Sequence, residues 1–198
     1  MTIPVTGKDH SRGEPDAPAA TLVEYGDYEC PHCRQLHLVV KEVMGRTRGL
    51  QYVYRHFPLT HIHPQAARAA EAAEAAAAQG RFWEMHDLLF ERNRGISEER
   101  LTQYAGEAGL ETGRFASEMA AGVYAAKVQE DFNSAIFKGH VSGTPTLYLN
   151  GESLDDAHDL PGLLAAVMRA GATLDLDSHW MAGWPAPLVG ILIGRSRL

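Results

Sequence analysis

Both cysteines of this 198-residue chain fall within one short stretch, YECPHCRQLH (Tyr28–His37), at positions 30 and 33. The preceding segment, TLVEYGDY (21–28), is rich in strand-forming residues, and the following segment repeats apolar residues at helical spacing. A second strand-like run, LQYVYRHF, occupies 50–57. The order strand, helix, strand predicts a crossover unit with two parallel strands, and Cys30 lies where the first strand gives way to the helix.

The residues from 64 to 138 predict almost only helix. An alanine-rich run and the amphipathic segment RFWEMHDLLFERN come first, and further helices are expected to begin near Ser97, Thr112 and Val123. Strand signals return in TPTLYLNGESL, where Asn150-Gly151 predicts a hairpin turn, and LPGLLAAVMRAG predicts a last helix. The crossover unit and the hairpin can share one sheet, with the helical block inserted between them.

Composition and charge argue against several classes of partner. The formal net charge is −7 and no basic stretch is present, so nucleic acid is not an expected partner. No run reaches the ~18 apolar residues of a membrane-spanning helix. The first residues contain no apolar run of the kind found in a secretory signal, so we expect a cytoplasmic protein, or an extracytoplasmic one if a signal was removed. The sequence indicates no oligomeric state.

The spacing of the two cysteines suits disulfide exchange. A thiol attacks a disulfide as the thiolate, and the N-terminus of a helix stabilises that negative charge, so the pKa of Cys30 should be lowered. Pro31 fits the first helical position, because its missing N–H would be unpaired there. Cys33 lies one turn later and can reach the Cys30 sulfur. His32 adds partial positive charge, whereas Glu29 opposes the thiolate.

Two other readings of the cysteine pair are weaker. A zinc site needs about four ligands, and with no second cysteine pair the histidines would have to supply the rest. The candidates are His37, His56, His61 and His63. A purely structural disulfide would close too short a loop to gain much chain entropy. A strand followed by C-x-x-C at a helix start instead indicates redox chemistry, and we expect neither a metal nor a cofactor.

The motif DYECPHC, followed far downstream by SGTPTLYLNG, resembles the DsbA-like thioredoxin-fold oxidoreductases, and most closely their compact, thioredoxin-4-type branch. A similar domain occurs fused to some sodium/proton antiporters. The resemblance implies an α/β thioredoxin fold with an inserted all-helical domain. The expected division is a flexible arm (1–17), a thioredoxin-fold domain (18–63 and 139–172), an inserted helical domain (64–138) and a tail of uncertain structure (173–198).

The resemblance also implies roles for individual residues. Cys30 would be the nucleophile and Cys33 the resolving thiol. The Thr144-Pro145 bond would be cis and face the cysteines, leaving the Thr144 backbone free to pair with an extended substrate. Glu24 would be a buried acid under the site, able to pass protons. We expect it to pair with Arg55 or His56 on the second strand.

These features predict a protein disulfide oxidoreductase that acts on protein thiols and disulfides and is recycled by an unidentified redox partner. C-P-H-C favours an oxidant, although a glutathione-buffered cytoplasm would favour reductase or isomerase work. Two alternatives remain open. One is a single-thiol, glutathione-dependent transferase or isomerase of related fold, against which Cys33 argues. The other is a redox-sensing or chaperone module without turnover.

Overall fold

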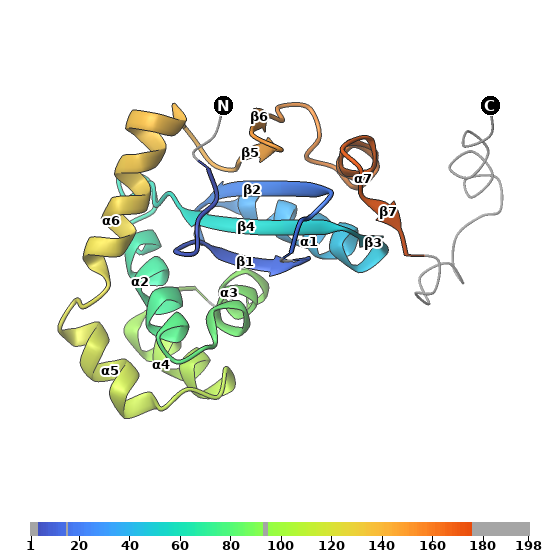
Figure 1. Ribbon diagram of the computed structural model, residues 1–198. Coiled ribbons are helices and arrows are strands. Elements are labelled where there is room, and N and C mark those ends of the chain that lie inside the picture. The colour runs from blue at the N-terminus through green and yellow to red at the C-terminus, as the bar shows by residue number, and fades with distance from the viewer. Residues whose placement is uncertain (1–3, 15, 93–94, 176–198) are drawn as a thin grey trace, which may run out of the picture.

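A computed structural model describes residues 4–14, 16–92 and 95–175 of the chain (Figure 1). The predicted tail at 173–198 therefore lies outside the described residues, except for its first three. Thr173–Leu174 (β7) pairs there with Thr47–Arg48 (β3) in a small two-stranded sheet. The start of the tail is thus fastened beside the end of the first long helix.

One mixed sheet forms the centre of the described part. Two neighbouring interior strands, β2 (Ala20–Gly26) and β4 (Leu50–His56), are parallel, as the crossover unit predicts, and β5 (Thr146–Leu149) runs antiparallel to β2. The order across the sheet is β1-β4-β2-β5-β6. The strands are β1 (His10–Gly13), β2 (Ala20–Gly26), β4 (Leu50–His56), β5 (Thr146–Leu149) and β6 (Glu152–Ser153).

The expectation of a loose arm over residues 1–17 is wrong for His10–Gly13, which form the edge strand β1. This strand pairs antiparallel with β4, with His10 opposite Tyr54. Arg12 anchors it, because its guanidinium lies 2.9 Å from Asp87 and 4.5 Å from the Trp83 ring. The sequence did not predict this strand because the segment is polar. An edge strand exposes one side and needs few apolar residues.

The helical block between the two sheet-forming parts follows the sequence closely (Figure 1). The Ser97 hydroxyl caps α4 by accepting a hydrogen bond from the Arg100 backbone N–H. The next cap differs from expectation: Glu111, rather than Thr112, accepts the N–H bonds at the start of α5. The elements are α2 (Ala66–Ala77), α3 (Phe82–Glu91), α4 (Glu98–Glu107), α5 (Thr112–Ala120), α6 (Ala125–Ser134) and the π-helix η1 (Ala135–Gly139).

The sheet is covered on both faces. Helices α1 (Pro31–Arg46) and α7 (Leu160–Arg169) pack on one face, with Leu36 and Leu163 fully buried against Leu22 of β2. Val23 faces the other side with a second apolar cluster that includes Ala135 of η1. In Figure 1, α6 runs along one end of the molecule, from α5 back to the sheet.

The predicted hairpin turn is present between β5 and β6. Asn150 and Gly151 have φ angles of 49° and 87°, the positive values that a tight two-residue turn requires. The turn is tied to the sheet, because the Asn150 side-chain oxygen accepts a hydrogen bond from the Thr21 backbone N–H at 2.8 Å. The antiparallel pairing of β5 with β2 places Thr146 opposite Tyr25, so Pro145 lies at the same end of the sheet as Cys30.

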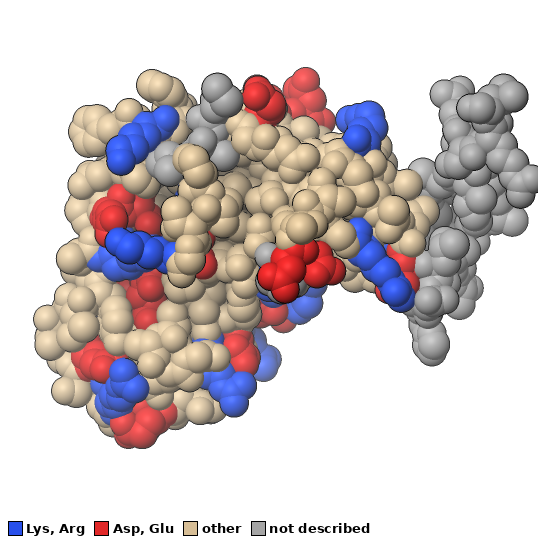
Figure 2. Space-filling view, in the orientation of Figure 1, with Lys and Arg blue, Asp and Glu red and all other residues tan. Residues whose placement is uncertain are grey.

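Acidic and basic side chains are interspersed on the face shown in Figure 2, where no patch of a single sign dominates. None of the helices in the described ranges is both long and apolar enough to cross a membrane.

Candidate functional site

The two cysteines lie at the start of α1. Cys30 is the residue that immediately precedes the helix, with an extended backbone, and Pro31 takes the first helical position. Both thiols are free, and Cys30 is 4% exposed whereas Cys33 is fully buried. The Cys30 backbone is fixed on both sides, because its N–H donates to Asp27 and its carbonyl accepts from Arg34. Only the first sulfur therefore offers any surface to a substrate.

The two thiols have opposite electrostatic environments. A hydrogen bond from the Cys33 thiol lowers the pKa of Cys30 to about 5, with smaller help from Thr144 and from backbone N–H groups of Cys33 and His32. Burial raises the pKa of Cys33 well above its ordinary value, and the hydrogen bond to Cys30 and the charge of Glu24 raise it further. At neutral pH Cys30 is thus a thiolate and Cys33 a thiol that donates to it.

Glu24 lies in the middle of β2 and is fully buried. Burial raises its pKa to about 7, although a hydrogen bond from Tyr52 lowers it in part. The Tyr52 hydroxyl donates to Oε2 at 2.7 Å, whereas the buried Oε1 has no partner among the described residues. A carboxyl group with a pKa near neutrality can both take and give a proton under physiological conditions.

The prediction that Glu24 pairs with Arg55 or His56 is wrong. Arg55 points to the opposite face of the sheet, where it binds Asp9 and the Tyr25 hydroxyl, because successive side chains of a strand alternate between faces. His56 is on the same face as Glu24 but binds Glu74 at 3.0 Å. Tyr52 is the side chain on that face with a donor within reach.

The segment before β5 forms the wall opposite the cysteines. The Thr144-Pro145 peptide bond is cis. The Cys30 sulfur lies 3.5 Å from the Thr144 carbonyl oxygen, to which the thiol can donate. The Thr144 side chain is on the Cys30 side of this segment, where it helps to lower the pKa of the thiol. Thr144 and Pro145 are both half-buried, so part of this backbone is open to a ligand beside the sulfur.

The side chains of His32 and Glu29, expected to favour and to oppose the Cys30 thiolate, both point away from the role that the sequence suggests. The His32 ring is exposed, and it is its backbone N–H that stabilises the Cys30 thiolate. The Glu29 carboxylate accepts a hydrogen bond from the Gln65 backbone N–H at 2.6 Å, so it is held beside the start of α2. The anion-stabilising effect thus comes chiefly from the Cys33 thiol, with smaller contributions from Thr144 and from the backbone N–H groups of Cys33 and His32.

Sequence reasoning missed two residues that support the motif. Asp27 is buried and accepts hydrogen bonds from the backbone N–H groups of Glu29 and Leu59, and it contacts His63 at 2.8 Å. Tyr28 is buried with its hydroxyl 3.1 Å from His86 Nδ1. Asp27 could have been found from its position between the strand and the cysteine motif, because a buried acid in an apolar setting needs several hydrogen-bond donors.

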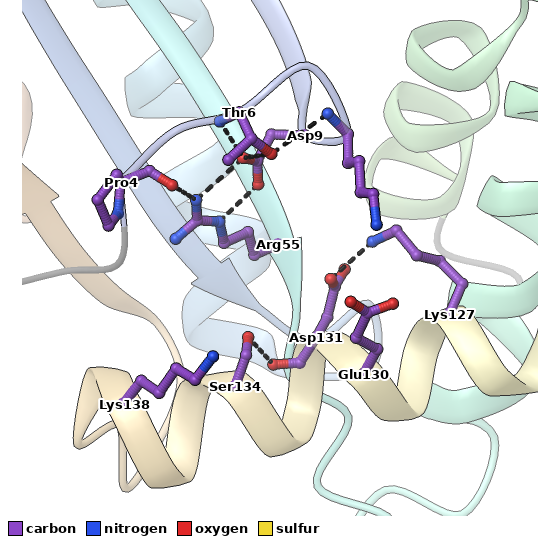
Figure 3. Close-up of a pocket in the computed structure, with 10 residues that line it drawn as sticks. Pro4, Thr6, Asp9, Arg55, Lys127, Glu130, Asp131, Ser134 and Lys138 are labelled. Atoms are coloured by element: carbon purple, nitrogen blue, oxygen red, sulfur yellow. Dashed lines mark hydrogen bonds and ion pairs between the residues drawn. The ribbon is translucent and has the colours of Figure 1, made fainter.

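A pocket of about 330 Å³ lies elsewhere, between the N-terminal segment, β4 and α6 (Figure 3). Its centre is the Arg55 guanidinium, which binds Asp9 and the Pro4 carbonyl oxygen. Lys127 and Asp131 form an ion pair on its other side, at 2.6 Å. Neither cysteine lines this pocket.

A dithiol at the start of a helix, beside a cis-proline at the same end of a mixed sheet, defines a protein of the thioredoxin class. A family model described as thioredoxin matches residues 5–168, and the chain belongs to this family. The match confirms the predicted fold class, an α/β thioredoxin fold with a helical insertion. The expected domain limits remain predictions.

The proteins similar in sequence are named as sodium/proton antiporters, and the match covers only part of each. The chain is 42% identical over 177 residues to a Na⁺/H⁺ antiporter NhaA 3 of Salinispora tropica, covering 89% of this chain and 27% of that protein. It is 43% identical over 173 residues to NhaA 1 of Salinispora arenicola, covering 87% and 26%. The chain thus spans about a quarter of the length of these relatives.

Solved structures support the fold. BdbD from Bacillus subtilis, in its oxidised form, superposes with a TM-score of 0.75 at 19% identity, covering 85% of this chain and 96% of that one. A thioredoxin-like oxidoreductase from Silicibacter pomeroyi gives a TM-score of 0.73 at 27% identity, covering 83% and 93%. The thiol-disulfide exchange protein alpha-DsbA2 from Wolbachia pipientis gives 0.71 at 20% identity, covering 82% and 87%.

Proposed function

We propose that this protein is a thiol–disulfide oxidoreductase that exchanges disulfides with protein cysteines through Cys30 and Cys33. The observation that carries the proposal is the split between the two thiols: the pKa of Cys30 is lowered to about 5, while that of the buried Cys33 is raised. One sulfur is therefore a nucleophile at neutral pH and the other a protected second thiol. The similar structures of a thioredoxin-like oxidoreductase and of a thiol-disulfide exchange protein agree with this chemistry.

Reduction of a substrate disulfide takes two steps. The Cys30 thiolate attacks one substrate sulfur, which forms a mixed disulfide and releases the other substrate sulfur as a thiolate. Cys33 then loses its proton and attacks the Cys30 sulfur, which forms the Cys30–Cys33 disulfide and releases the second substrate thiolate. The reverse sequence transfers the disulfide to a substrate dithiol, so the same residues serve both directions.

Glu24 is the proposed proton carrier for Cys33. Its charge contributes to the raised pKa of Cys33, so the two groups lie close enough to interact. The carboxylate can take the Cys33 proton when this thiol attacks, and it can return the proton when the dithiol forms again. Since the pKa of Glu24 is about 7, both states are populated near neutral pH.

Thr144 and Pro145 are the proposed substrate contact. An extended substrate segment can pair with the half-buried Thr144 backbone in the manner of an added strand, which places a substrate sulfur beside Cys30. Such pairing reads the backbone rather than one side chain, so we expect a range of protein substrates. The recycling partner would use the same contact.

The proposed direction is oxidation of substrate dithiols. A lowered pKa of the attacking thiol stabilises the reduced form of the pair relative to its disulfide, which makes the disulfide a stronger oxidant. The cytoplasmic location expected from the sequence remains a proposal. In a glutathione-buffered compartment the pair would be held reduced and would act as a reductase or isomerase.

The test is turnover of a disulfide-containing or reduced model protein by the purified chain. Cys30→Ser should abolish both reduction and oxidation. Cys33→Ala should retain the first attack and accumulate a mixed disulfide that non-reducing gel electrophoresis detects. Full activity of Cys30→Ser would refute the proposal, and so would turnover of a glutathione conjugate undiminished by Cys33→Ala, which would indicate single-thiol chemistry.

A further inference from the structure

Three side chains far apart in the sequence converge on one point away from the cysteines. His10 comes from β1, His56 from the end of β4, and Glu74 from α2. The Nε2 atoms of both histidines approach the same carboxylate oxygen, Glu74 Oε1, at 2.8 Å and 3.0 Å. All three ligand atoms lie within 4.8 Å of one another. We propose that these residues bind a divalent first-row transition-metal ion, and that zinc fits them best.

The donor set is the first argument. Imidazole nitrogen and carboxylate oxygen are both zinc ligands, and two histidines with one glutamate are a known three-ligand combination. Ligand atoms about 2.1 Å from a tetrahedral ion lie roughly 3.4 Å from each other. The two distances to Glu74 Oε1, 2.8 Å and 3.0 Å, are shorter than that separation, so the side chains would have to move apart by roughly half an ångström to admit the ion.

The surroundings are the second argument. Exposure of the side chains is 1% for His56, 7% for Glu74 and 17% for His10, so two ligands are held by the core and the third lies at the entrance. The His10 ring is stacked on Phe82 with 3.6 Å between ring centroids, which fixes its orientation. The partly exposed side, at His10, can supply water as the fourth ligand.

The charge of the carboxylate is also suitable. An incoming cation would meet the Glu74 carboxylate directly beside both imidazoles. The Lys127 ammonium is 3.8 Å from Glu74 Oε1. Figure 3 shows this ammonium bound to Asp131 on the same helix, which keeps it beside the site instead of within it.

A second histidine–carboxylate group in the described part of the chain is less suited to a cation. It consists of His37, His86 and Asp87. The Arg12 guanidinium already lies 2.9 Å from the Asp87 carboxylate and would repel an incoming ion. This second group can therefore serve as an internal control for metal binding at the first.

The proposed ion would join three parts of the fold at one point: the edge strand, the central sheet and the inserted helices. It goes beyond the exchange reaction and uses neither cysteine. The site is still near the motif, because the His56 ring lies 6.0 Å from that of Tyr28, between ring centroids. An ion there would stabilise the attachment of β1 and α2 behind the start of α1.

The test uses the full chain carrying Cys30→Ser and Cys33→Ser, so that no thiolate can bind zinc. Isothermal titration with Zn²⁺ should show one site per chain. Glu74→Gln should weaken it at least roughly a hundredfold, because even changes outside the ligands weaken metal sites by ~10- to 100-fold. Lys127→Ala should tighten binding, by up to roughly tenfold, since it removes a nearby like charge. The exposed His61→Ala is the matched histidine control and should bind as the parent does.

A spectrum provides a readout that does not depend on one variant's stability. Co²⁺ in place of Zn²⁺ should give visible bands of a nitrogen- and oxygen-ligated ion, which His10→Ala removes. Absence of one-to-one binding in the parent would overturn the proposal. Binding that persists in Glu74→Gln and is lost in Asp87→Asn would also overturn it, because the ion would then lie in the other group.

Discussion

The hydroxyl of Tyr52 donates a hydrogen bond to Oε2 of Glu24 over 2.7 Å, in the buried layer beneath the dithiol. The two residues belong to the neighbouring parallel strands β4 and β2, with Leu22 rather than Glu24 directly opposite Tyr52. The bond therefore runs diagonally between strands. It gives the ionised carboxylate a donor, while the other oxygen has none among the described residues.

Tyr52→Phe should raise the pKa of Glu24 above its value of about 7, because the lost bond favours the ionised form. A hydrogen bond to a charged group contributes roughly 1.5–3 kcal/mol. The variant should also lose stability of that order at pH 8, where the carboxylate is charged. Infrared titration of the carboxyl band measures the pKa, and Tyr104→Phe, on α4, is a tyrosine control that should leave it unchanged.

Glu24→Gln should change how stability depends on pH. The folded protein keeps the Glu24 proton up to about pH 7, whereas a carboxyl with the ordinary pKa of 4.5 has lost it. Stability of the wild type should therefore fall as pH rises from about 4.5 to 7, by about 3 kcal/mol in all, and Glu24→Gln should remove this loss. Urea unfolding of the disulfide form at pH 5 and pH 8 measures the part of the effect that comes from burial, because neither thiol titrates and the smaller contribution of the Cys30 charge is absent. An unchanged slope in the variant would contradict the assignment.

The Cys30 thiol should titrate with a midpoint near pH 5 in the reduced protein, as its pKa of about 5 requires. Cys33→Ala should move the midpoint upward, because the Cys33 thiol is the strongest stabiliser of the thiolate. Reactivity with iodoacetamide and ultraviolet absorbance of the thiolate both measure it. His32→Ala should change it less than Cys33→Ala, since the exposed ring contributes less than the backbone N–H; the opposite ranking would refute this account.

Arg12→Ala should destabilise the protein by about 1–2 kcal/mol. Its guanidinium lies 4.5 Å from the Trp83 ring and 2.9 Å from Asp87, and both contacts fasten the edge strand to α3. Arg114→Ala removes an exposed ion pair within one helix and should leave the thermal unfolding midpoint unchanged. Equal losses of stability in the two variants would show that the Arg12 contacts of β1 contribute nothing to the stability of the protein.

Local patterns account for what could be predicted from the sequence. The strand ending at the motif, the helix opened by Pro31, and the Asn150-Gly151 turn each depend on a few neighbouring residues, and all three are present. The positions of Cys30 and Cys33 follow from the same local rules. The cis bond before Pro145 came from family resemblance, because backbone preference alone favours the trans form.

Contacts between distant segments account for what could not be predicted. The partner of Glu24 depends on the register between two strands, and a choice among Tyr52, Arg55 and His56 requires knowing which face each side chain occupies. The strand at His10–Gly13 forms only because β4 offers it an open edge. Both cases involve pairings that no short-range periodicity encodes.

The wall that faces Cys30 comes from Thr144, 114 residues later in the chain. A ribosome that adds ~5–20 residues per second needs roughly 5 to 25 s to make that interval. Throughout this interval the contacts that lower the pKa of Cys30 are incomplete, because Thr144 is one of them. The activated thiol is therefore a property of the finished fold and is absent while the chain is still being made.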